Sequence, residues 1–247
     1  MKSIGKFLIF MGELFQRRET FRTYVRLTTE ECIKVGFNSI FIVTIISLFM
    51  GAVTTIQTAH NLVSPFIPDP IIALVVRDMT VLELSPTIIA IVFAGKVGSN
   101  IAGELGTMRI TEQIDALEVM GINATSYLVL PKILGSMIMF PMLVIISIFL
   151  TMWGGYVAGT LSGLISGTDY ILGIRSQFIP FSIAFAMIKA YTFSFVVASI
   201  SSFKGFYTRG GALEVGIAST NAVTNSCIGI LAADLALAQL FAEYLGQ

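Results

Sequence analysis

Residues Phe93–Pro131, FAGKVGSNIAGELGTMRITEQIDALEVMGINATSYLVLP, decide how the chain is organised, because hydrophobicity falls within them and returns at their end. Residues 111–120 have helical spacing, with Thr111 as a suitable N-cap and Gly121 able to end the helix in a left-handed conformation. Such a helix would be about 15 Å long, too short to cross a bilayer. It carries an acidic stripe of Glu112, Asp115 and Glu118. The sequence therefore predicts a short polar helix outside the membrane, between two segments inside it, which suits docking of a partner protein.

The composition is that of an integral membrane protein. Of 247 residues, 55% are hydrophobic and 12% are charged, and the apolar residues form long blocks. The net charge is zero, which argues against a nucleic-acid partner. Two cysteines and a single histidine, His60, indicate neither a disulfide framework nor a metal centre.

Residues 1–34 read as an amphipathic helix. Phe7, Leu8, Met11, Leu14 and Phe15 share one face, and Lys6, Arg17 and Arg18 are among the positive charges nearby. The pattern predicts a helix lying in the membrane interface and attracted to anionic lipid. A soluble helix packed on a partner fits the same residues and stays open as the alternative.

Residues 35–247 are expected to form one transmembrane permease domain with five spans. The predicted spans are residues 36–59, 84–102, 133–157, 179–200 and 218–241. Pro65, Pro68 and Pro70 are expected to break helix structure between the first two spans, and Pro141 is a potential kink in the third. The fold class is thus an all-α membrane protein.

Positive charge is unevenly distributed between the connections. The first 34 residues hold seven Lys or Arg, the 96–132 connection three and the 201–212 turn two, whereas the opposite side holds only Arg77 and Arg175. By the positive-inside rule, the N-terminus, the polar helix and the 201–216 turn are predicted to be cytoplasmic. Five spans then place the C-terminus outside.

No catalytic site is evident in these residues. A phosphate-binding loop is approached only at Gly95-Lys96, where Ala90 and Val97 occupy positions that the motif needs. We find no convincing nucleophile–base pair, zinc ligand set or dinucleotide fingerprint. The chain is therefore not expected to be an enzyme, to bind a cofactor or to hold a metal.

Lys189 stands in the middle of a predicted span, in AFAMIKAYTF. A central charge costs on the order of 2.5–3.5 kcal/mol on insertion scales, so it needs a partner or a wet cavity. Two interpretations remain: Lys189 contacts an anionic group in transit, or it is paired within the helix bundle. Glu83 precedes the second predicted span at its outer boundary.

The quoted central stretch closely resembles the core motif of the MlaE (YrbE) permeases, membrane subunits of ABC transporters for phospholipid and related lipids. The similarity extends over nearly the whole chain, including GAVTTIQTAHNL at 51–62, LELSP at 82–86, WGGYVAG at 153–159 and the residues from Ile188 to Leu237.

That resemblance implies a homodimer of permeases in the bacterial inner membrane. Each would have an interfacial N-terminal helix, five spans and a cytoplasmic coupling helix docked on a separate ATPase that binds the ATP. An MCE-domain protein would sit on the periplasmic face. Carried over by position, Glu104 and the acidic helix, with Thr111, Glu112, Asp115 and Glu118, serve ATPase coupling, and Glu83, Lys189 and Gln57 contact substrate.

Two departures and two alternatives qualify this picture. Many members have arginine where this chain has Leu82, and Asn123-Ala124 replaces the usual Asp-Pro after the coupling helix. A permease for another hydrophobic cargo, such as a sterol or drug, fits the same residues. So does a membrane scaffold that only anchors partners. Transport direction is not encoded in these features.

Overall fold

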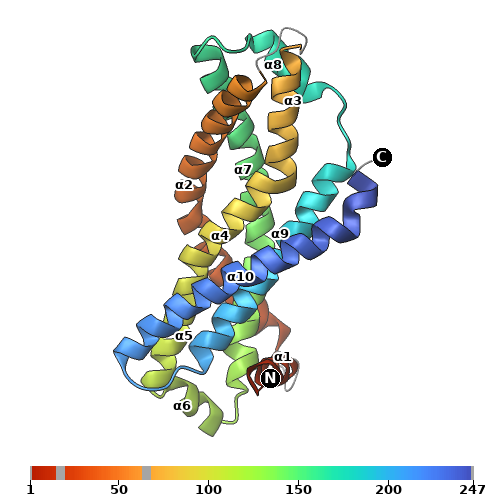
Figure 1. Ribbon diagram of the computed structural model, residues 1–247. Helices are drawn as coiled ribbons and strands as arrows, with labels where there is room; N and C mark the ends of the chain where they lie inside the picture. Colours follow the sequence, from red (N-terminus) through yellow and green to blue (C-terminus); the bar gives the residue numbers. More distant parts are fainter. Residues whose placement is uncertain (1, 15–19, 63–67, 246–247) are drawn as a thin grey trace. The chain divides into compact units, whose positions relative to one another are not determined.

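A computed structural model describes residues 2–14, 20–62 and 68–245, which form helices and connections without a strand. Five helical segments are long and apolar enough to cross a membrane (Figure 1). They are Phe21–Asn61, Pro70–Ile110, Thr125–Leu161, Phe181–Phe206 and Ala212–Phe241. The prediction of an all-α membrane protein with five spans is confirmed.

The contacts divide the chain into two compact units. The first unit comprises Met1–Asn38, Ala90–Phe140 and Tyr191–Leu235, and the second comprises Ser39–Ile89, Pro141–Ala190 and Ala236–Gln247. Each long helical segment contributes residues to both units, so the division falls within the spans and not at a linker.

The N-terminal region forms two helices where a single amphipathic helix over 1–34 was expected. Helix α1 covers Lys2–Glu13, whereas residues from Phe21 onward belong to α2, Phe21–Asn61, which continues without a break into the first span. The expected apolar and basic residues Phe15, Arg17 and Arg18 lie outside the described residues.

Helix α1 is anchored in the first unit by aromatic packing. The buried ring of Phe10 lies 5.6 Å from that of Phe203, 5.5 Å from Phe206 and 5.8 Å from Tyr207, centroid to centroid. Leu8 and Ile9 on the same helix are exposed. One side of α1 is therefore packed on protein, and the other presents apolar side chains, as an interfacial helix would.

The second span is longer than predicted because the helix begins at Pro70. Two π-helical stretches join the three α-helices of this span without interruption. The α-helices are α3 (Pro70–Met79), α4 (Ile89–Phe93) and α5 (Ser99–Ile110), and the π-helical stretches are η1 (Thr80–Ile88) and η2 (Ala94–Gly98). Pro70 occupies the start of α3, where a missing N–H breaks no helical hydrogen bond. It therefore starts the helix that it was expected to break; Pro65 lies outside the described residues.

The predicted polar helix is present but begins two residues late. Helix α6 covers Gln113–Val119, and Thr111 ends α5, since its hydroxyl donates back to the Thr107 carbonyl at 2.8 Å. The N-cap of α6 is instead Glu112, with a left-handed φ of 61°. Gly121 ends α6 with φ +79°, as the sequence predicted.

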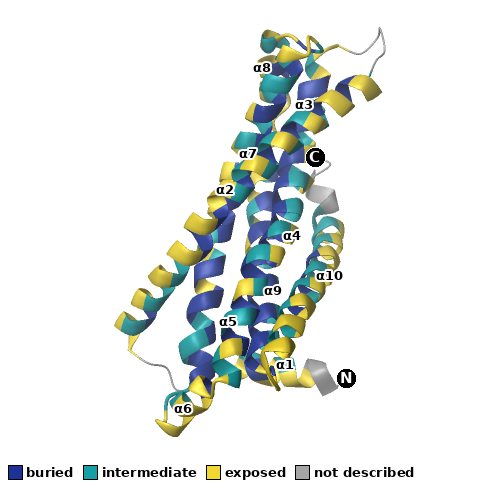
Figure 2. Ribbon diagram, turned by 90° about the vertical axis from the view of Figure 1, so that its left-hand side faces the viewer, coloured by how far each residue is buried: buried dark blue, intermediate teal, exposed yellow. Residues whose placement is uncertain are grey.

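The third and fifth spans enclose the predicted residues 133–157 and 218–241, whereas the fourth begins at Phe181, two residues after the predicted start of 179–200. The three spans comprise η3 (Thr125–Val129) with α7 (Leu130–Leu161), α9 (Phe181–Phe206) and α10 (Ala212–Leu245), with a short helix α8 (Gly167–Arg175) between α7 and α9. The turn between α9 and α10 is shorter than the expected 201–216, because α9 runs on to Phe206. Figure 2 shows that α10 is largely exposed or half-buried over residues 212–241.

Within the second unit, glycines allow close helix contact. A Cβ on Gly51 of α2 would lie 1.8 Å from the Thr151 carbonyl oxygen of α7, and one on Gly154 of α7 would lie 2.4 Å from the Leu48 carbonyl oxygen. Small residues of this kind let membrane helices approach backbone to backbone. The contact fixes α2 against α7.

Candidate functional site

Glu83 and Lys189 form an ion pair in the second unit. The Lys189 Nζ lies 2.8 Å from Glu83 Oε1 and donates to the Leu82 carbonyl at 2.9 Å. The Lys189 side chain is fully buried, whereas that of Glu83 is 53% exposed. Glu83 is therefore a charged partner of this buried lysine, and its carboxylate is the accessible half of the pair.

The backbone around Glu83 departs from a regular α-helix. Glu83 stands in the π-helical stretch η1, which also contains Pro86, a residue without an N–H. Local π-helical geometry is frequent at functional sites, because it re-aims side chains that a regular helix would place elsewhere. Here it brings Glu83 towards Lys189 of α9, beside the Phe185 ring at 5.0 Å from the ammonium.

Gln57, the third residue expected to contact substrate, has an exposed side chain on α2. Among the described residues, it makes no hydrogen bond to Glu83 or Lys189. The structure therefore brings together two of the three residues.

Arg77 has a role that the sequence did not reveal. Its buried guanidinium donates to the carbonyls of Ile174 at 2.9 Å, Ser176 at 2.5 Å and Gln177 at 3.2 Å, and pairs with Asp78 at 2.8 Å. These bonds tie the C-terminal end of α8 and the residues after it to α3. From the sequence, Arg77 could be assigned only to a connection between spans. The carbonyls that accept its hydrogen bonds lie about a hundred residues away along the chain.

In the first unit, α6 has the properties of a docking element. Only Ile114 is buried, and the predicted acidic residues Glu112, Asp115 and Glu118 are exposed, as are the apolar Val119 and Met120 (Figure 2). Asp115 pairs with Arg109 of α5 at 2.6 Å, which fixes the turn between the two helices. The far end is closed by hydrogen bonds from Gly121 and Ile122 to α6 carbonyls. A rigid, acidic and partly apolar surface results.

Tyr207 lies beside this region, at the end of α9. Burial raises the pKa of the Tyr207 phenol, and the nearby Glu13 carboxylate raises it further, against an opposing effect of Arg109. The phenol therefore stays neutral at physiological pH. It acts in the aromatic packing of α1 described above.

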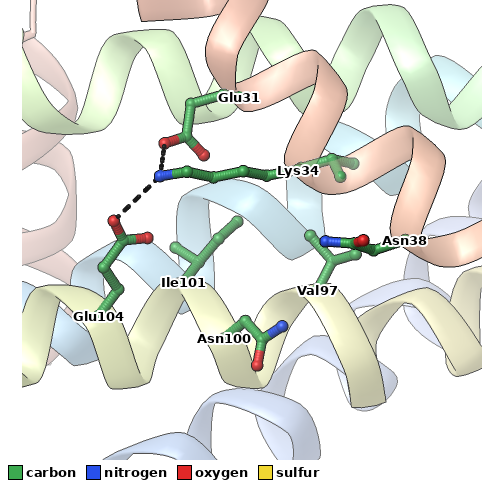
Figure 3. Close-up of a pocket in the computed structure, with 8 residues that line it drawn as sticks. Glu31, Lys34, Asn38, Val97, Asn100, Ile101 and Glu104 are labelled. Atoms are coloured by element: carbon green, nitrogen blue, oxygen red, sulfur yellow. Dashed lines mark hydrogen bonds and ion pairs between the residues drawn. The ribbon is translucent and has the colours of Figure 1, made fainter.

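Glu104, expected to serve coupling, belongs to a group of four charged residues from three helices. Lys132 of α7 lies 3.0 Å from Glu31 of α2 and 2.6 Å from Glu104 of α5. Lys34 of α2 bridges the same two carboxylates at 3.2 and 3.4 Å (Figure 3). We call these four residues the ionic ring. Glu31, Lys34 and Glu104 also line a cavity of about 390 Å³.

Lys132, Lys34 and Glu31 were not singled out from the sequence. Lys132 follows Pro131 just before a predicted span. At such a position the ammonium of a lysine is expected to extend into water. The Lys132 side chain is instead 3% exposed. Spacing along one helix does not show contacts with α2 and α5, so no signal in the sequence identified the ring.

The described residues contain no group of three or more His, Cys, Asp or Glu side chains arranged to hold a metal ion. The charged clusters are instead mixed in sign. Their geometry suits positioning of helices and recognition of a charged group.

Known proteins resemble this chain along most of its length. The family model described as Permease MlaE matches residues 28–240. A probable ABC transporter permease protein of Rickettsia bellii is 35% identical over 240 residues, covering 97% of this chain and 92% of the relative. Another from Synechocystis sp. is 32% identical over 236 residues, covering 96% and 89%.

A plant protein is similar as well. The chloroplastic protein TRIGALACTOSYLDIACYLGLYCEROL 1 of Arabidopsis thaliana is 32% identical over 248 residues, covering 97% of this chain and 68% of the relative. With five candidate spans and a family match over most of its length, this chain belongs to the MlaE family of permeases, as its central motif predicted.

Proposed function

We propose that this permease moves phospholipid, or a related lipid, between the bacterial inner membrane and a periplasmic MCE-domain protein, driven by a separate ABC ATPase. The observation that carries the proposal is the Glu83–Lys189 pair, a buried ammonium neutralised by a half-exposed carboxylate within the candidate spans. The name of the Arabidopsis relative, which contains that of a glycolipid, supports a lipid cargo.

The pair suits a polar headgroup by exchange of partners. A lipid phosphate is an acceptor that competes with Glu83 for the Lys189 ammonium, and charge-assisted hydrogen bonds of this kind are strong where water is scarce. The released carboxylate then accepts from a donor on the same headgroup. Acyl chains need only the apolar surface that the spans already present.

The Leu82 side chain cannot take the place of the arginine that many relatives have there. In this chain the neighbouring interaction comes from the backbone, since the Leu82 carbonyl accepts from Lys189. Recognition of the headgroup phosphate is therefore assigned to Lys189 alone among these residues.

We propose that the ATPase acts on the permease through α6. Its acidic side chains and the exposed Val119 and Met120 match a partner surface with an apolar pocket and basic rim. We also place the N-terminus and α6 in the cytoplasm and the C-terminus in the periplasm, on the basis of the positive charge in residues 1–34 and 96–132. The working unit is proposed to be a homodimer.

The test is to purify the permease together with its ATPase and identify the bound lipids by mass spectrometry. Phospholipid enriched over the detergent background, and depleted in Lys189→Met, is expected. Lys204→Met is the matched control, because Lys204 lies on the same helix as Lys189, α9, near its C-terminal end, and is not part of the Glu83 pair. Enrichment of a sterol or another amphiphile supports the alternative cargo, and a complex that never carries lipid favours a scaffold.

A further inference from the structure

We propose that the ionic ring of Glu31, Lys34, Glu104 and Lys132 is the joint that transmits movement of α6 into the spanning helices. The inference rests on the proposed function, since it assigns positioning residues to ATPase coupling. It concerns contacts within the first unit only.

The ring joins both helices that flank α6. Glu104 lies on α5, which leads into α6, and Lys132 lies on α7, the helix after it. Both are bonded to α2 through Glu31 and Lys34. A displacement of α6 that pulls on α5 or α7 therefore reaches α2 through charged contacts.

The contacts of the buried Lys132 are the stronger ones in the ionic ring. Lys132 is almost fully enclosed and reaches a carboxylate on each of two other helices, at 3.0 and 2.6 Å. Lys34, at the outer side, is 57% exposed and its contacts are longer. Exposed pairs contribute little, whereas a buried charge that loses its partner is strongly unfavourable. The two carboxylates are thus held mainly by Lys132.

Close backbone packing makes the joint stiff. A Cβ on Gly135 of α7 would lie 3.0 Å from Glu31 Cβ, so α2 and α7 are in contact beside the ring. On its other side, α5 packs against α9, where a Cβ on Gly205 would lie 2.6 Å from the Ala102 carbonyl oxygen. Helices packed this tightly move as units, so the ring carries displacement and does not absorb it.

The arrangement has a cost that a purely structural role does not explain. A hydrophobic group in place of Lys132 and its partners would fill the same space without burying charge, and such replacements are often neutral or stabilising. Charged pairs, by contrast, hold the helices that they join in one defined geometry. We infer that the ring sets how far α5 and α7 follow each other.

The experiment measures lipid movement and ATP hydrolysis together, in proteoliposomes containing the permease, its ATPase and fluorescent phosphatidylglycerol. Lys132→Met is expected to lower the lipid moved per ATP hydrolysed by roughly tenfold, within the range of ordinary coupling between sites. Glu104→Gln, which frees α5 but leaves Lys132 bonded to Glu31, provides a milder variant if Lys132→Met does not fold.

Glu30→Gln is the matched control for Glu104→Gln. Glu30 pairs with Arg26 at 3.0 Å within α2 itself, with both side chains exposed, so its loss frees no neighbouring helix. Its coupling ratio is expected to stay at the wild-type value. A Glu104→Gln ratio that also stays there would overturn the inference.

The double variant Glu104→Gln/Lys132→Met separates coupling from stability. We expect it to regain thermal stability relative to Lys132→Met, because only one carboxylate, Glu31, then lacks the buried ammonium, but to remain uncoupled. Recovery of both stability and coupling would show that the ring is only structural and would refute the inference. If the wild-type complex itself moves no lipid, the proposed function fails, which is a different result from normal transport by both ring variants.

Discussion

Glu83→Gln is expected to destabilise the protein more than Lys189→Met, although both substitutions break the same ion pair. Glu83→Gln removes the carboxylate 2.8 Å from a fully buried ammonium, while the other contacts of Lys189, the Leu82 carbonyl among them, remain. Breaking a buried pair costs about 3–5 kcal/mol, and the half-exposure of Glu83 lowers this to roughly 2–4 kcal/mol. Lys189→Met leaves a carboxylate that is already half exposed and fills the lysine's volume, so its cost is about 1 kcal/mol or less.

The assay is chemical or thermal unfolding of the purified permease in detergent, with Lys204→Met as the control for losing a lysine from α9. The double variant Glu83→Gln/Lys189→Met should return close to the stability of Lys189→Met, since the buried charge is gone. Equal costs for the two single variants, a reversed order, or a double variant as unstable as Glu83→Gln would refute the reasoning.

Three further predictions follow from the same structure. Gly51→Val should cost about 3 kcal/mol of stability, because its Cβ would collide with the Thr151 carbonyl oxygen; an unchanged unfolding midpoint would contradict the close α2–α7 contact. Arg77→Met should cost roughly 3 kcal/mol of stability by leaving three carbonyls without their donor, and proteolysis between α8 and α9 should accelerate; unaltered cleavage would show that Arg77 does not hold this segment in place. Ala116→Cys, in a chain with Cys32 and Cys227 replaced by serine, should react with an impermeant maleimide in inverted vesicles but not in intact spheroplasts, and the opposite pattern would place α6 outside.

The five spans could be predicted because long apolar blocks leave few alternatives in a bilayer. Their ends could not, because capping depends on contacts that spacing does not show. Pro70 reads as a helix breaker but stands at the first position of α3, where it is tolerated. Thr111 was predicted to be an N-cap, yet it lies at the end of α5 and its hydroxyl donates a hydrogen bond to the Thr107 carbonyl. Gly121 was predictable, since a left-handed helix end strongly favours glycine.

Residues of the candidate site could be predicted from the sequence, but which of them form ion pairs could not. The cost of a charge in a span singled out Lys189, and the resemblance singled out Glu83, but only the structure joins them. The ionic ring and Arg77 went unrecognised for a related reason. Lys132 contacts Glu31 about a hundred residues away, and no periodicity along one helix encodes such a contact.

The central claim is that this permease moves phospholipid with energy delivered by an ATPase. The most direct measurement is the redistribution of fluorescent phospholipid in proteoliposomes that contain the permease and its ATPase, with ATP, with a non-hydrolysable analogue, and with Lys189→Met. We predict movement that requires ATP hydrolysis and falls at least about tenfold in Lys189→Met, because a hydrogen bond to a charged group contributes about 1.5–3 kcal/mol. ATP hydrolysis without any lipid movement, or movement that Lys189→Met leaves unchanged, would contradict the account.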